Sequence, residues 1–171
     1  MTRFDNRDVA FDVPDGWEDM TVVAFHAPQA PGSVFATNVT LSRVERKPTA
    51  TLPIYATQQI ANLSSTLPNF ELVSQRDVTF GGRPAVELFF HWRADEQAIA
   101  QRITIFERKG GVWSFAASAL RDLYEQNLPG FDRIATTLKF GDEPAAPPTG
   151  NTAPPSLRGG DRGGLDKPRG W

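Results

Sequence analysis

The chain has 171 residues and a net charge of −2, with 20 acidic side chains against 18 Lys and Arg. This balance supplies no cationic surface of the kind that a sequence-independent nucleic-acid binder needs, so nucleic acid is not an expected partner. The sequence contains no cysteine, which excludes disulfides, thiolate metal sites and cysteine nucleophiles. No apolar run approaches the roughly 18 residues of a membrane span, and the start has no apolar signal region. These features predict a soluble cytoplasmic protein without direct membrane anchoring.

The C-terminal segment differs in composition from the rest of the chain. Seven of the 14 glycines and six of the 14 prolines follow Phe140. Such a segment cannot bury enough apolar area to offset the entropy lost on ordering, so residues 141–171 are expected to form a flexible Pro/Gly-rich tail. Residues 1–140 then form one domain of ordinary size. The tail is interpreted either as a solubilising linker or as a docking peptide with Trp171 as its apolar anchor.

The N-terminal part of the domain predicts short strands, at residues 2–5, 8–13, 20–27 and 33–45. Val9, Phe11 and Val13 alternate with polar or small residues, which is the pattern of a half-buried strand. Pro14 ends that strand, and Gly16 in the following turn can adopt a positive φ without a steric clash. The last of these strands carries apolar residues on both faces, so we expect both faces to be covered at least in part.

A helix is expected to begin at Thr51. Thr51 can cap the first turn, and Pro53 suits that turn because its missing N–H would have no partner there. The apolar residues that follow recur at helical spacing and form one stripe: Ala56, Ile60, Leu63 and Leu67. Pro68 and Asn69 end the helix. The stripe predicts the face that packs on a sheet.

The sequence from residue 70 to 120 predicts a four-stranded antiparallel meander. Its turns are expected at residues 81–82, 93–96 and 109–111. In its second strand, one face carries the apolar side chains of Val86, Leu88, Phe90 and Trp92.

A closing helical segment is expected after the meander. It begins near Arg121, is interrupted by Pro129-Gly130, and is completed by Phe131, Ile134 and Leu138. The order of all these elements predicts an α+β fold, in which helices flank one antiparallel β-sheet.

Residues that carry catalytic or metal chemistry are scarce. The two histidines, His26 and His91, do not lie at metal-ligand spacing, and structural or surface roles explain them better. The glycine pairs lack the spacing of a phosphate-binding loop, and no G-x-S-x-G serine motif occurs. We therefore expect no catalytic residue, no metal site and no cofactor, and predict that the protein is not an enzyme.

Four segments, taken in order, carry a resemblance to a known family. They are F-D-V-P-D-G-W-E-D-M-T-V-V-A-F at 11–25, N-V-T-L-S-R at 38–43, the helix I-Y-A-T-Q-Q-I-A-N-L-S-S-T-L-P-N-F at 54–70, and G-R-P-A-V-E-L-F-F-H-W at 82–92 with Q-R-I-T-I-F-E-R at 101–108. Their order and spacing resemble the DcrB-related group of small bacterial proteins, which share the fold of Mog1 and PsbP. The match covers nearly all of residues 1–140. Without a cysteine to lipidate, the chain is most similar to the Eag chaperones of type VI secretion.

This resemblance implies a cytoplasmic, non-enzymatic homodimer. It would bind the hydrophobic N-terminal transmembrane segment of a type VI secretion effector and shield that segment from water until the effector is loaded on the secretion spike. The exposed apolar surface of such a segment would otherwise drive aggregation, and a groove that accepts a helix can cover it. The alternative is a Mog1/PsbP-like binding module for a soluble protein partner.

The resemblance also implies partner-binding residues around one groove: Val22, Ala24, Thr40, Gln59, Leu67, Gln101 and Ile103. Ala24 and Thr40 are smaller or more polar than the bulky aliphatic residues that suit this role. Val22, Ala24 and Leu67 could equally be ordinary core residues, and Gln59 a surface glutamine. The register near Gln101 is open by one residue, and a shift of one residue would turn its side chain to the other face.

Overall fold

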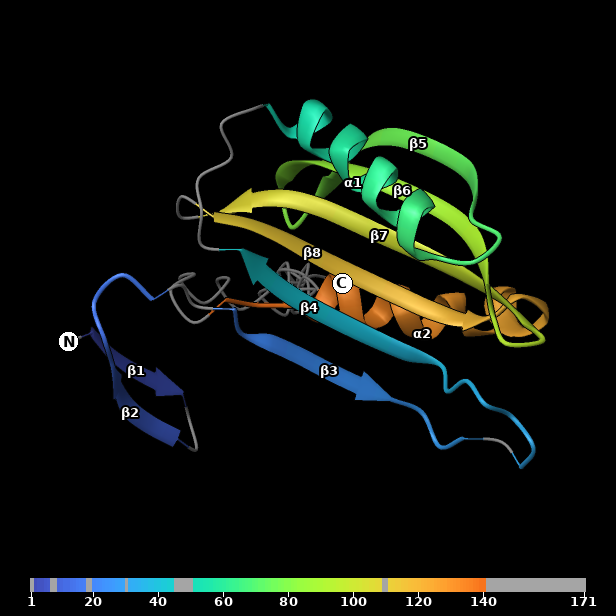
Figure 1. Ribbon diagram of the computed structural model, residues 1–171, viewed down its shortest axis with the longest axis horizontal. Coiled ribbons are helices and arrows are strands. Elements are labelled where there is room, and N and C mark those ends of the chain that lie inside the picture. The colour runs from blue at the N-terminus through green and yellow to red at the C-terminus, as the bar shows by residue number, and fades with distance from the viewer. Residues whose placement is uncertain are drawn as a thin grey trace, which may run out of the picture. The chain divides into compact units, whose positions relative to one another are not determined.

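The computed structural model describes residues 2–6, 9–17, 20–29, 31–44, 51–108 and 111–140 (Figure 1). The chain divides into two units, Met1–Leu138 and Lys139–Trp171, and the first unit contains every described helix and strand. The expected turn residues 109–110 and the predicted tail at 141–171 lie outside the described residues, so the interpretation of the tail stays a prediction.

The first unit contains two separate antiparallel sheets. β1 (Thr2–Asn6) and β2 (Val9–Val13) form a two-stranded hairpin. The larger sheet has six strands: β3 (Val22–His26), β4 (Asn38–Val44), β5 (Glu71–Phe80), β6 (Arg83–Ala94), β7 (Gln97–Arg108) and β8 (Gly111–Leu120). Their spatial order is β3-β4-β8-β7-β6-β5, so the predicted meander is confirmed and β4 adds beside its last strand.

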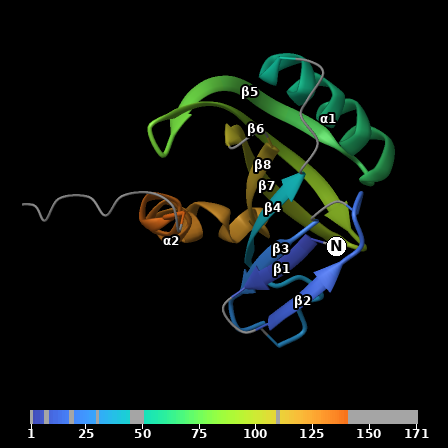
Figure 2. The ribbon, with the colours of Figure 1, turned by 90° about the vertical axis from the view of Figure 1, so that its left-hand side faces the viewer.

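Two helices lie on opposite faces of the six-stranded sheet, α1 (Leu52–Thr66) on one side and α2 (Tyr124–Thr137) on the other (Figure 2). A short 3₁₀ turn, η1 (Arg121–Leu123), leads from β8 into α2. The predicted α+β class, with helices flanking an antiparallel sheet, is confirmed.

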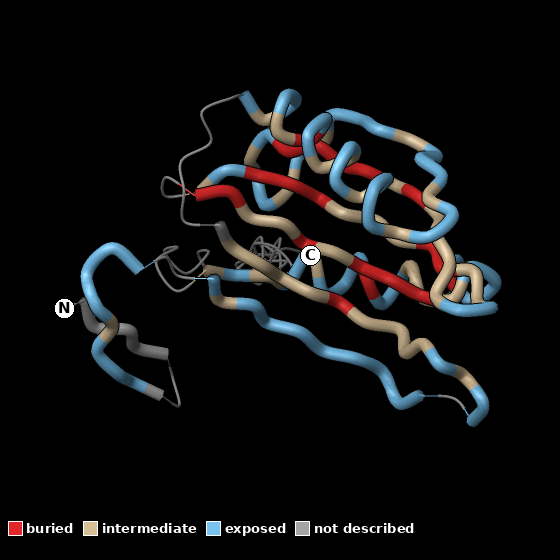
Figure 3. The backbone as a smooth tube through the Cα atoms, in the orientation of Figure 1, coloured by how far each residue is buried: buried red, intermediate tan, exposed pale blue. Residues whose placement is uncertain are grey.

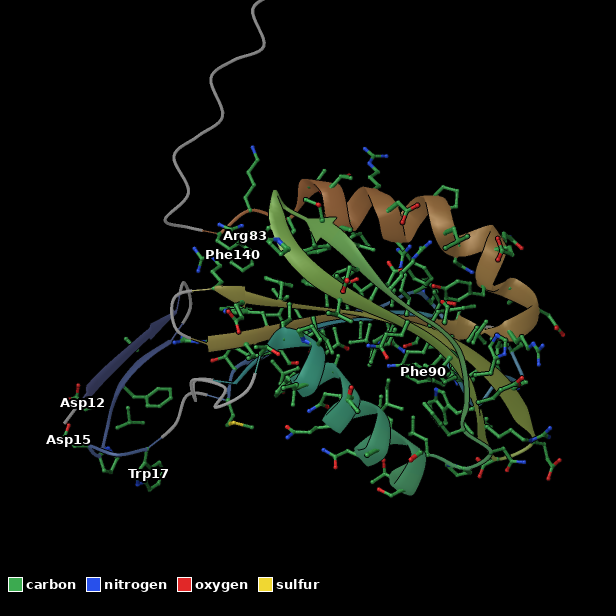
Figure 4. The ribbon with its side chains drawn as sticks, turned by 90° about the horizontal axis from the view of Figure 1, so that it is seen from above. Asp12, Asp15, Trp17, Arg83, Phe90 and Phe140 are labelled. Carbon is green, nitrogen blue, oxygen red and sulfur yellow. The ribbon has the colours of Figure 1, made fainter. Side chains whose placement is uncertain are left out.

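One hydrophobic core cluster lies between α1 and the sheet. Leu88, Phe90 and Ala56 are completely buried there, and Val86 and Ile105 are nearly so. Figure 4 labels Phe90 among these crowded side chains, and its ring centroid lies 5.1 Å from that of Phe70. The rest of the predicted helix stripe packs against the same cluster: Ile60, Leu63 and Leu67. The alternation predicted for the second meander strand is therefore confirmed, because its apolar face forms this core.

The predicted interruption of the closing helix at Pro129-Gly130 is wrong. α2 continues through both residues to Thr137. Tyr124 and Phe131, on either side of this dipeptide, are 4% and 3% exposed, and their ring centroids are 5.7 Å apart. Burial of these two aromatic rings stabilises the helix in spite of its proline, because tertiary packing of one face outweighs intrinsic propensity.

The predicted strand at residues 33–45 is too long at its N-terminal end, because β4 begins only at Asn38. Before Asn38, backbone carbonyl groups accept hydrogen bonds from side chains. Ser33 Oγ donates to the carbonyl of Phe35 at 2.7 Å, and Asn38 Nδ2 donates to that of Ala36 at 2.9 Å. Local hydrogen bonds of this kind compete with the hydrogen bonds that the backbone would form to a neighbouring strand.

Glycines with positive φ form two of the predicted turns. Gly16 has a φ of 86°, as predicted, and Gly81 and Gly82 have φ values of 55° and 74° between β5 and β6. Thr51 occupies the N-cap of α1, but its side chain makes no capping hydrogen bond, so the cap expected from its hydroxyl is not formed.

Candidate partner-binding face

Strand register brings several predicted partner-binding residues into one row. Residues that pair across antiparallel strands have their side chains on the same face of the sheet. Ala24 pairs with Thr40, Thr40 pairs with Ala116, and Ala116 pairs with Ile103. These four side chains therefore form a continuous row across β3, β4, β8 and β7, on the face where α1 packs, because Ile103 contacts the core under α1.

The other predicted residues lie on the same side of the sheet. Val22 and Gln101 are two residues along their strands from this row, so they share its face. The pairing of Gln101 with Phe90 fixes the register that the sequence left open. Gln59 lies half-buried on α1, and Leu67 is the C-cap of that helix and contacts the core. The structure thus brings all seven residues to one side, while their role in binding stays a prediction.

Part of this face is not covered by α1, which contacts β6 and β7. We call the part formed by β3, β4 and β8 the open face, defined by Val22, Ala24, Thr40, Ser42, Ser114 and Ala116. Val22 is 58% exposed and Ala24 is also exposed, so neither is an ordinary core residue. The exposed edge strand β3 and the half-buried strand β4 are visible in Figure 3.

The open face is composed of small, uncharged side chains. Apart from Val22, its members are alanines or carry hydroxyl groups. The hydroxyl oxygens of Ser42 and Ser114 lie 2.6 Å apart and form a hydrogen bond across β4 and β8. Small side chains let another backbone approach closely, and hydroxyl groups supply hydrogen bonds to it. This surface therefore suits a closely packed apolar helix better than a charged partner.

Three further residues, Trp92, Phe35 and Gln97, hold Gln101 or the loop before β4 and were not among the expected partner-binding residues. Trp92 Nε1 donates a hydrogen bond to Gln101 Oε1 at 3.0 Å. The ring of Phe35 meets the ring of Trp92 edge-on, with centroids 6.1 Å apart. Gln97 Oε1 accepts hydrogen bonds from the backbone N–H of Val34 and from Ser33, which ties the β3–β4 loop to the start of β7. The alternation of β6 could have located Trp92, but the contact with Phe35 depends on the fold of the loop.

The opposite face of the sheet has a different character. Phe25, Val39, Phe131 and Ile134 line an apolar pocket of about 270 Å³ between α2 and the β3–β4 edge. Nearer the C-terminal end of α2, the lining of a cavity of about 540 Å³ contains three charged residues, Glu87, Arg102 and Asp132. None of the predicted partner-binding residues lines either space.

Several ionisable groups on the α2 side have shifted pKa values. Burial raises the pKa of Tyr124 to about 12. Burial, and secondarily the charge of Arg121, lowers the pKa of His91, against the opposing effect of Glu71. Burial alone would lower the pKa of Arg102, but its hydrogen bond to Asp132 and the nearby carboxylates raise it overall.

Within the described ranges, no three His, Asp or Glu side chains are arranged to hold a metal ion. In the same part of the chain, no helix is both long and apolar enough to cross a membrane.

Comparison with known proteins identifies the family. The family model described as DcrB matches residues 9–137, which is most of the chain. The chain belongs to the DcrB family. This DcrB-family protein is 27% identical over 112 residues to Effector EagT6 of Pseudomonas aeruginosa, and the match covers 66% of the chain and 77% of EagT6. The resemblance predicted from the four sequence segments is therefore confirmed.

Solved structures also resemble the DcrB-family chain. The crystal structure of PA94, a protein of unknown function from P. aeruginosa, aligns with a TM-score of 0.68 at 22% identity, covering 82% of this chain and 96% of PA94. The two proteins therefore share a fold. The solution structure of PsbP from the cyanobacterium Synechocystis aligns with a TM-score of 0.43 at 15% identity, covering 79% and 89% of the two chains.

Proposed function

We propose that this DcrB-family protein is a cytoplasmic, non-enzymatic chaperone for an effector of the type VI secretion system. It binds the hydrophobic N-terminal transmembrane segment of that effector and shields it until the effector is loaded on the secretion spike. The observation that carries the proposal is the uncharged, partly exposed open face beside α1. The similarity to Effector EagT6 supports an effector as the partner.

The chemistry of the open face fits a transmembrane helix. Such a helix presents about 20 mainly apolar residues, whose surface drives association in water. Ala24 and Ala116 allow close approach of its backbone, and the Ser42 and Ser114 hydroxyls supply polar contacts to small residues of the client. Gln59 of α1 is half-buried and lies on the helix beside its apolar stripe, so it can border the bound segment.

A homodimer is part of this proposal, and the edge strand β3 supports it. Within the described residues, β3 pairs only with β4, and its side chains are exposed on both faces: Val22 58%, Val23 43% and Phe25 70%. Proteins usually protect such an edge with charge, proline or a bulge. The sequence V-V-A-F-H of β3 has no proline, lysine or acidic residue. Antiparallel pairing with β3 of a second copy would give the backbone N–H and C=O groups of this edge strand hydrogen-bond partners. It would also place two open faces side by side.

Co-expression with the effector encoded beside this gene tests the proposal. The effector's N-terminal region is produced with and without its transmembrane segment, and capture on the tagged chaperone is measured. Capture should require the segment and should fall with Val22→Asp or Gln59→Ala. Leu123→Asp is the matched control, because Leu123 is also an exposed apolar residue but belongs to η1, away from β3 and the open face.

The result also distinguishes the two functions considered from the sequence. Capture that persists without the transmembrane segment, together with insensitivity to Val22→Asp, would favour a module that binds a soluble protein partner.

A further inference from the structure

The hydrogen bond between Trp92 and Gln101 determines which end of the Gln101 amide is free. An indole N–H is only a donor, so its partner must be the amide oxygen of Gln101. The distance of 3.0 Å from Trp92 Nε1 to Gln101 Oε1 agrees with this assignment. The orientation of the Gln101 amide thus follows from the chemistry of its neighbour.

Trp92 is itself held in place by its surroundings. Its ring contacts the core beneath α1 and meets the Phe35 ring edge-on, at an interplanar angle of 83°. Phe35 belongs to the loop that Gln97 anchors through Val34. These contacts hold the indole in place, so its N–H keeps its direction toward Gln101.

The amide nitrogen of Gln101 is left for another partner. Among the described residues, none accepts a hydrogen bond from Gln101 Nε2, and this atom is not enclosed. Gln101 lies next to Ile103 on β7 and pairs with Ser118 of β8, at the border of the open face. A segment bound there would meet two N–H donors of the Gln101 amide, whose oxygen already accepts the hydrogen bond from Trp92.

We infer that Trp92 fixes Gln101 as a hydrogen-bond donor, so that the face selects a helix with an oxygen acceptor at that point. This inference rests on the proposed function and concerns the same surface. The acceptor is a side-chain oxygen of the bound helix, because the backbone carbonyls within a helix already accept its internal hydrogen bonds. A wholly aliphatic helix would leave the N–H groups of Gln101 buried without a partner, which costs affinity. Trp92 is a positioning residue in this account, because it acts through Gln101.

Two synthetic peptides test the inference with the full-length protein. Each is a 20-residue Leu/Ala helix flanked by lysines, with O-methylserine at every fourth position in one and norvaline in the other. The two side chains have nearly the same shape, but only O-methylserine has an acceptor oxygen, and it cannot donate. The repeated spacing presents one such side chain near Gln101 in any register. Binding is measured by fluorescence anisotropy.

The wild-type protein should bind the O-methylserine peptide roughly five- to tenfold more tightly than the norvaline peptide, as expected for one additional hydrogen bond. Gln101→Leu and Gln101→Glu should both abolish this preference, because neither side chain can donate when Glu is ionised. Trp92→Phe keeps an aromatic ring but removes the N–H, so the amide can turn and the preference should shrink. Loss of stability alone would lower both affinities equally and leave their ratio unchanged.

The possible failures separate the inference from the proposed function. Equal binding of the two peptides by the wild-type protein would overturn the role of Gln101 and leave the proposed function standing. An undiminished preference in Trp92→Phe would overturn the role of Trp92. If the wild-type protein binds neither peptide, both the proposed function and this inference fail.

Discussion

Arg102 of β7 and Asp132 of α2 form an ion pair that joins the helix to the sheet, with 2.7 Å between Arg102 Nη2 and Asp132 Oδ1. Arg102 Nε also lies 3.9 Å from Glu87 Oε2 on β6. Arg102 stands between Gln101 and Ile103 in sequence, so its side chain points to the opposite face. One strand thus supplies both the attachment of α2 and the border of the open face.

Removal of Asp132 tests this attachment. Asp132→Asn should lower the free energy of unfolding by about 1 kcal/mol, because the Asp132 side chain is 59% exposed and solvent screens much of the interaction. Urea unfolding at low and high salt measures the effect, which should be smaller at high salt. Glu125→Gln on the same helix is the control. Equal losses in both variants would mean that the pair has no specific role.

A larger loss is expected at Glu87, which is only 8% exposed. Its carboxylate accepts a hydrogen bond from Arg76 Nε at 2.8 Å and lies beside Arg102. Glu87→Leu would leave the partly buried Arg102 with one acidic partner fewer, and we expect a loss of roughly 2–3 kcal/mol by urea unfolding. Arg76→Leu should cost less, because the Arg76 side chain is 64% exposed. The reverse order would contradict this account.

The pH dependence of stability should reflect His91. Burial and Arg121 lower its pKa in the folded state. Below about pH 6.5 the unfolded chain therefore binds more protons than the folded chain. The contribution of His91 is fully present above that pH and is lost as the pH falls toward the folded-state pKa. The urea midpoint should drop between pH 7 and pH 5.

A histidine variant identifies the source of that drop. His91→Gln should make the urea midpoint less dependent on pH, whereas His26→Gln, on the exposed strand β3, controls for the loss of a histidine. An identical drop in wild type and His91→Gln would exclude His91 as its cause.

Two phenylalanines provide a direct test of the core. Phe90 is completely buried, whereas Phe25 on β3 is 70% exposed. Phe90→Ala should destabilise the protein by about 3–5 kcal/mol through lost apolar burial and a new cavity. Phe25→Ala should change the free energy of unfolding by less than about 0.5 kcal/mol if β3 is uncovered in the protein tested. A large loss at Phe25 would indicate that β3 is covered, as in a dimer.

Local patterns in the sequence were sufficient for much of the fold. The alternation in β6 and the stripe on α1 are properties of single elements, so they identify the two surfaces that meet at Phe90. The course of α2 through Pro129 depends instead on the burial of Tyr124 and Phe131, which is a tertiary effect. The start of β4 at Asn38 depends on side-chain bonds within the preceding loop. Neither effect produces a periodic pattern of apolar residues in the sequence.

The candidate face could be predicted only through family resemblance. No local pattern indicates that β4 lies beside β8, yet this pairing is what brings Thr40 next to Ala116. Long-range pairing of this kind is specified by the whole sheet and not by one strand. The hydrogen bond from Trp92 to Gln101 likewise links β6 and β7. It could not be predicted without the register between these two strands.

The exposed edge strand gives the last prediction. If β3 pairs with β3 of a second copy, the wild-type protein should be a dimer by light scattering at micromolar concentration. Val23→Lys combined with Phe25→Lys should yield a folded monomer, because lysine on an edge strand opposes strand pairing and both residues are exposed in the single chain. Ile54→Lys with Leu123→Lys is the control, because these exposed residues lie away from β3. A dimer that persists in the β3 variant would require a different interface, and dissociation of both variants would indicate a general effect of charge.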